Sequence, residues 1–110
     1  MEKTLTIDGK QIRFKSSGGV MMRYRNQFNA DFLAEVRELS EEQFSFAAVE
    51  RIVWVLAKTA DSSIPDPQTW LDGFDSIDLL SVWRELSPLI TASLNTKVKN
   101  AETAAATANQ

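Results

Sequence analysis

The sequence contains neither cysteine nor histidine. Without cysteine the chain cannot form disulfides or thiolate sites, and without histidine it lacks the base of Ser-His-Asp and Cys-His sites and the usual zinc ligands. Carboxylates, lysines, hydroxyls and the phenol of Tyr24 remain as potential catalytic groups. We therefore expect a protein that is not an enzyme and that uses no metal and no other cofactor.

A long apolar run and an excess of positive charge are also missing. The most apolar stretch, residues 44–60, is interrupted by Glu50 and Arg51 and falls short of the roughly 18 apolar residues that a membrane span needs. Residues 1–6 lack the pattern of a signal peptide. The formal net charge of −3 argues against a protein that neutralises phosphates. We expect a cytoplasmic protein without a membrane or nucleic-acid partner.

Residues 3–15 alternate apolar and polar side chains on either side of Asp8-Gly9. An Asp-Gly pair between such runs predicts a hairpin with a type I′ turn, because that turn needs positive φ at both central positions. The turn would pair Leu5 with Ile12 and separate two faces. The apolar face would hold Leu5, Ile7, Ile12 and Phe14, and the polar face Thr4, Thr6, Gln11 and Arg13. A lone hairpin is marginally stable, so its apolar face must pack on helices or on a second copy.

Capping residues divide the next segment into three expected helices. The first begins near Gly19 and ends at Asn29, which can adopt the left-handed conformation, and Asp31 can cap the second. The sequence from Ser40 to Gln43 has the pattern of a capping box and predicts the start of the third helix. Apolar residues cover more than half of that helix, from Phe44 onward, which predicts a central position in a small bundle.

Two prolines end this central helix. Pro65 and Pro67 each disfavour helix in the preceding residue and lack an amide donor. Asp66 with Pro67 at the first helical position predicts another helix, which would bring Trp70 and Phe74 onto the core.

Ser76 or Asp78 can cap a last helix, which Pro88 is expected to kink or divide. Its apolar positions are Leu79, Leu80, Trp83, Leu86 and Ile90. The sequence thus predicts a mainly α (α+β) protein, a hairpin followed by about four to five helices. We expect one domain over residues 1–94 and a flexible C-terminal tail over residues 95–110.

Met21, Met22 and Trp54 are the first candidates for contact with a partner. Methionine adapts to varied surfaces, and tryptophan is enriched at interface hot spots. Trp54 shares its helix face with Glu50 and Lys58, four residues away on either side, so it points along the charged side. The alternative is that the hairpin or the first helix covers Trp54.

Basic residues interleaved with an aromatic ring form a second candidate surface, made of Arg13, Lys15, Arg23, Tyr24 and Arg25. Such a patch can bind nucleic acid or an acidic protein surface. The alternative is a solvated strand face and a helix whose arginines extend over apolar neighbours, which the acidity of the chain favours. We therefore assign Tyr24 and Arg25, together with the methionines, to a protein-binding surface.

Five short segments follow one another in a distinctive order. They are Ile-Asp-Gly-Lys-x-Ile-x-Phe-Lys in the hairpin, Arg23-Tyr-Arg25 with Phe28, Ile52-Val-Trp-Val-Leu-Ala-Lys58, Ala60-Asp-Ser-Ser-Ile-Pro65, and Trp70-Leu-Asp-Gly-Phe74. Over residues 5–90 this order resembles the tail assembly chaperones of long-tailed bacteriophages and of related prophages of Gram-positive bacteria. Two positions depart from the family, which often has Thr-Pro in place of residues 20–22 and glycine in place of Asn29.

The resemblance implies a chaperone that binds the long tape measure protein in the host bacterial cytoplasm and keeps it soluble. Such chaperones help the major tail tube protein to polymerise around the tape measure protein and are then shed, so the mature virion should lack them. The family also implies a longer, frameshifted form of the chain as a further partner. Self-association is a separate expectation, since the apolar hairpin face could pack on a second copy.

The sequence is also compatible with two other classes of function. The first alternative is a structural tail or head-tail completion protein that is retained in the virion. A nucleic-acid-binding regulator is the second, and it would show binding that weakens steeply with salt.

Overall fold

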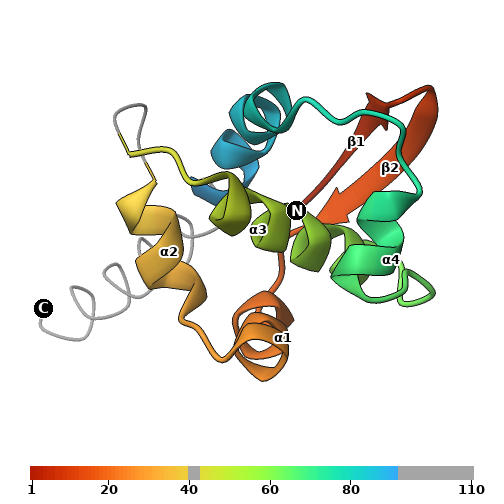
Figure 1. Cartoon of the computed structure of the whole chain (residues 1–110). Coiled ribbons are helices and arrows are strands. Elements are labelled where there is room, and N and C mark those ends of the chain that lie inside the picture. Colours follow the sequence, from red (N-terminus) through yellow and green to blue (C-terminus); the bar gives the residue numbers. More distant parts are fainter. Residues whose placement is uncertain (40–42, 92–110) are drawn as a thin grey trace, which may run out of the picture.

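The computed structural model describes residues 1–39 and 43–91 (Figure 1). The elements in chain order are β1 (Glu2–Ile7), β2 (Lys10–Lys15), α1 (Gly19–Phe28), α2 (Phe32–Glu38), α3 (Phe46–Ala60), α4 (Pro67–Asp72) and a last helix over residues 79–91. The predicted α+β order of a hairpin followed by helices is therefore confirmed. The tail expected over residues 95–110 and the domain end at 94 lie outside the described residues.

The hairpin has the predicted turn and register. Asp8 and Gly9 have φ values of 53° and 76°, the positive angles that a type I′ turn requires. Leu5 pairs with Ile12, and the four residues of the predicted polar face are exposed. The apolar face is buried or half-buried, and β2 packs on α3. The hairpin is thus covered by a helix of its own chain.

The hairpin turn is also fixed to a segment far along the sequence. The Asp75 amide donates to Asp8 Oδ2 at 2.9 Å, and Lys10 Nζ donates to the Gly73 carbonyl at 2.6 Å. The Lys10 ammonium lies 5.2 Å from the centre of the Phe74 ring, within the range of a cation–π contact. Asp8 and Lys10 therefore act as anchors as well as turn residues.

Helix α3 lies at the centre of the fold, as predicted (Figure 1). Residues 52–57 are six consecutive buried positions, so this helix is surrounded on every side. Helices α1 and α4 and strand β2 all pack against it. A helix with apolar residues over more than half of its circumference is expected in such a position.

The start of α3 differs from the prediction. Ser45, in extended conformation, is the N-cap, and its Oγ accepts from the Ala48 amide at 3.2 Å. Gln43 therefore precedes the helix, and Ser40 lies outside the described residues. A hydroxyl can cap only the point where the chain turns from extended to helical, and Ser45 occupies that point. Phe46 belongs to the apolar positions expected from Phe44 onward, yet it is 59% exposed in the first turn.

The two-proline corner has the predicted geometry. Helix α3 ends at Ala60, and α4 begins with Pro67 behind the N-cap Asp66, whose Oδ2 accepts from the Thr69 amide at 3.1 Å. Trp70 is buried and meets the half-buried Phe74 edge to face, with ring centroids 5.1 Å apart. The short helix α4 thus carries one large aromatic residue into the core.

Asp78, rather than Ser76, caps the last helix. Its Oδ1 accepts from the Ser81 amide at 3.2 Å. At the other end, the helix continues through Pro88 to residue 91, so Pro88 does not divide it, and the alternative expectation of a kink stays a prediction. Buried Leu86 and Ile90 lie on either side of the proline and hold both parts of the helix on the core.

The buried stripe of the last helix is shifted from the predicted one. Val82, with Leu86 and Ile90, is buried, whereas Leu80 is 38% exposed and Trp83 is half-buried. These three buried residues are four positions apart and form one stripe along the helix. Leu80 and Trp83 lie beside this stripe, so they are only partly covered. Trp83 still packs against the core, which agrees with its predicted structural role.

Three aspartates at helix and turn starts predict how stability depends on pH. Hydrogen bonds from the hydroxyl and then the amide of a serine or threonine two or three residues later lower the pKa of Asp61, Asp66 and Asp78. A lowered folded-state pKa adds stability above the unfolded pKa of about 4, and this is lost as pH falls through the folded value. We expect the urea midpoint to fall more steeply below about pH 4 in the wild type than in a triple Asp→Asn variant. Equally steep curves would contradict this assignment.

Candidate functional site

Tyr24 is inside the protein and not on a binding surface. Its side chain is 0% exposed, and its ring packs against Phe28 at 4.9 Å and Phe32 at 5.4 Å between centroids. The predicted partner-facing role of Tyr24 is therefore wrong. A tyrosine can be buried in this way when its hydroxyl finds hydrogen-bond partners inside.

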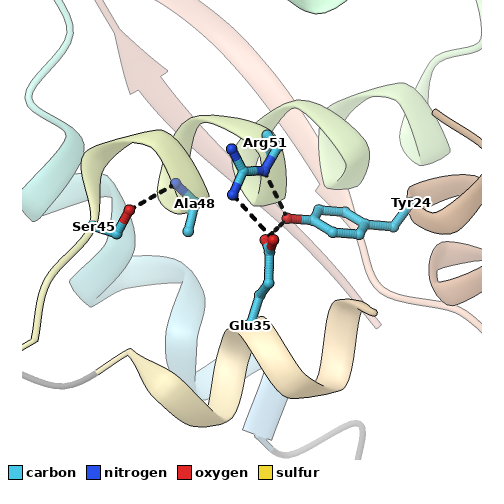
Figure 2. Close-up of polar contacts among 5 residues, drawn as sticks. All are labelled: Tyr24, Glu35, Ser45, Ala48 and Arg51. Carbon is cyan, nitrogen blue, oxygen red and sulfur yellow. Dashed lines mark hydrogen bonds and ion pairs between the residues drawn. The ribbon is translucent and has the colours of Figure 1, made fainter. Parts of the chain in front are cut away.

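The partners of the Tyr24 hydroxyl join three helices (Figure 2). The hydroxyl donates to the carboxylate of Glu35 on α2 and accepts from Arg51 Nε on α3 at 3.2 Å. Arg51 Nη2 completes the triangle by donating to Glu35 Oε1 at 3.0 Å. The roles of Glu35 and Arg51 could not be predicted from the sequence, because nothing local shows that residues 24, 35 and 51 converge. This triad is the polar link that holds α2 against α1 and α3.

A double-mutant cycle tests whether the triad acts as a unit. We expect Glu35→Gln to lower the free energy of unfolding by about 1–2 kcal/mol, since it weakens charge-assisted hydrogen bonds in a partly buried site. Combined with Tyr24→Phe, it should show a coupling of about 1 kcal/mol in urea unfolding. Exposed Glu38→Gln on the same helix should change stability by less than about 0.5 kcal/mol. Additive effects of the two triad variants would contradict the link.

Trp54 is also buried, so its predicted partner-facing role is wrong and the alternative, cover by the first helix, is correct. It is 3% exposed, and Phe28 of α1 meets its ring edge to face at 5.5 Å. The indole N–H donates to the Pro65 carbonyl at 2.8 Å. Pro65 therefore has a structural role beyond ending the helix, because it supplies the acceptor that lets this tryptophan be buried.

The four basic residues do not form one free patch. Arg23 Nη1 donates to Thr59 Oγ1 at 2.8 Å, and Arg13 Nη2 donates to the Ala60 carbonyl at 3.4 Å. Both guanidinium groups thus lie at the C-terminal end of α3, where the helix dipole favours positive charge. Lys15 and Arg25 are exposed.

The predicted surface that remains accessible lies on α1. Met22 is 59% exposed, Met21 is half-buried, and Arg25 is exposed, with a guanidinium that makes no hydrogen bond or ion pair with any described residue. Met22 lines two shallow hollows, one of about 320 Å³ toward α2 and one of about 400 Å³ toward α3. We call these two hollows and the Met22 ridge between them the Met22 face.

Apolar side chains form much of the first hollow, where Met21, Phe32 and Leu33 lie beside Met22. The second hollow is more polar: Arg23, Asn26 and Lys58 surround the small accessible edge of Trp54. A tryptophan that is almost fully buried therefore contributes to the surface only at the base of a hollow.

Over residues 1–39 and 43–91, no group of three or more carboxylates could hold a metal ion. No helix in the same ranges is long and apolar enough to cross a membrane. Comparisons of the chain with protein-family models, with curated proteins and with solved structures found no match.

Proposed function

We propose that this protein is a tail assembly chaperone of a long-tailed bacteriophage or prophage, which binds the tape measure protein in the host cytoplasm. The observation that carries the proposal is the order of the five segments that resemble this family. In the fold, these segments supply the hairpin turn, the aromatic residues of α1, the buried run of α3, the Pro65 carbonyl, and Trp70 with Phe74. The resemblance therefore falls on residues that determine the fold.

The shape of the molecule suits such a task. A long helical polypeptide with an apolar stripe must be covered until the tail tube replaces the cover, which calls for many copies of a small protein. The Met22 face is one shallow surface with an adaptable side chain at its centre. The proposal requires an affinity moderate enough for the chaperone to be shed when tube subunits arrive, and a single shallow surface suits such a transient contact.

Co-expression with the tape measure protein encoded immediately downstream tests the proposal. We expect a soluble complex that co-purifies, with several copies of this chain per tape measure chain as counted by native mass spectrometry. The major tail tube protein should displace this chain when it is added. A tape measure protein that stays insoluble and never associates, with this chain found in purified virions, would favour a structural tail or head-tail completion protein.

A further inference from the structure

The Met22 face carries positive charge on a protein that is acidic as a whole. Among the described residues that line its two hollows, Arg23, Arg25 and Lys58 are cations and Asp31 is the one carboxylate. Asp31 already accepts from the Ala34 amide as the N-cap of α2. The net charge of the chain is −3, so this face has the opposite sign to the molecule.

The three cations are not equivalent. Arg23 donates to Thr59 Oγ1, and Lys58 Nζ donates to the Ser62 carbonyl at 2.7 Å. Arg25 has no such contact with the described residues, and it lines the same hollow as Met21 and Met22. It therefore offers a planar guanidinium that can bind a carboxylate through two parallel hydrogen bonds.

We infer that the Met22 face docks one amphipathic helix whose apolar stripe is flanked by aspartate or glutamate. Side chains three or four positions apart on such a helix would enter the hollows on either side of Met22. Flanking carboxylates would meet Arg25 in one hollow and the positive field of Arg23 and Lys58 in the other. Under the proposed function, on which this identity of the partner rests, the helix belongs to the tape measure protein.

A nucleic acid fits the face less well. Two of its three cations already bind groups near the end of α3, which leaves one unengaged guanidinium beside a ridge of methionine. Binding to a nucleic acid depends on several cations that contact successive phosphates of its backbone. One arginine next to an apolar hollow instead matches a helix that carries a carboxylate beside its apolar stripe.

Two synthetic peptides test the inference. Both are 18-residue amphipathic helices with the same leucine stripe, one flanked by glutamate and the other by lysine, and binding is followed by fluorescence anisotropy. We expect the glutamate peptide to bind at least roughly tenfold more tightly, with a gap that narrows as salt rises. Amide chemical shifts should change on α1 and at the start of α2.

Variants locate the contact. Met22→Ala and Arg25→Glu should each weaken binding of the glutamate peptide by at least about fivefold, and Met22→Leu should retain it. Arg84→Glu makes the same change of charge on exposed Arg84, which lines neither hollow, and should leave binding unchanged. Circular dichroism and thermal unfolding would verify that every variant is folded.

Four outcomes would overturn the inference: equal affinity for the two peptides, equal effects of Arg25→Glu and Arg84→Glu, tighter binding to a single-stranded RNA probe, or self-association that Arg25→Glu abolishes. If the tape measure complex forms normally with Met22→Ala and Arg25→Glu, the proposed function stands and this surface is wrong. If the peptides discriminate as expected but no tape measure complex forms, the surface stands and the proposed function fails.

Discussion

Replacing Trp54 with alanine is expected to lower the free energy of unfolding by about 3–5 kcal/mol, because it removes a buried indole and leaves a cavity. The ring is 3% exposed, packs against Phe28 of α1 and donates from its N–H to the Pro65 carbonyl. One substitution would therefore loosen the contact between α1 and α3 and release the proline corner. Equilibrium unfolding in urea measures the effect.

Trp54→Phe separates the two contributions of this residue. Phenylalanine keeps an aromatic ring beside Phe28 but leaves the Pro65 carbonyl without its donor, so we expect a smaller loss, about 1–3 kcal/mol. Met22→Ala on the exposed face should change stability by less than about 0.5 kcal/mol. A Trp54→Ala variant with normal stability and reduced partner binding would show that Trp54 belongs to the interface after all.

Trp70→Ala is expected to have an effect of similar size, about 3–5 kcal/mol, for a different reason. Helix α4 is six residues long, too short to be stable by itself, and Trp70 is its buried anchor. Without the indole, Phe74 loses its edge-to-face partner. Residues 73–75, which form hydrogen bonds with Asp8 and Lys10, then lose the contact that holds them in place.

The matched control is Leu80→Ala, which truncates an apolar side chain that is 38% exposed on the neighbouring helix and should cost less than about 0.5 kcal/mol. In native-state hydrogen exchange, Trp70→Ala should reduce protection first in α4 and in the hairpin. Unchanged protection in the hairpin would contradict the proposed support.

The features that sequence analysis predicted correctly depend on neighbouring residues. The positive φ values at Asp8 and Gly9, the left-handed Asn29 with φ of 52°, and Pro67 at the start of α4 follow from the conformational limits of single residues. Ser45 shows the limit of such reasoning. Ser40 and Ser45 both offer a hydroxyl before an apolar run, and the local pattern does not show which of them caps the helix.

The candidate site was harder to predict, because burial depends on contacts between distant parts of the chain. Helical spacing correctly placed Trp54 on the charged side of α3, yet Phe28 and the Pro65 carbonyl cover it there. Tyr24 looked like a surface aromatic among arginines until Glu35 and Arg51 supplied partners for its hydroxyl. Met22 and Arg25 remained exposed because no described residue of this chain packs over them.

The attachment of the hairpin turn to residues 73–75 sets the order in which the chain can fold during synthesis. The two anchoring hydrogen bonds, Asp75 to Asp8 and Lys10 to Gly73, span 67 and 63 positions of sequence, and a third, from Lys3 to Glu85, spans 82. At roughly 5–20 residues per second, the ribosome needs several seconds to make the segment that receives the turn. Until then the apolar strand face of the nascent chain is only partly covered. Slow codons between residues 16 and 73 would lengthen that interval, and we expect them to lower the yield of soluble protein.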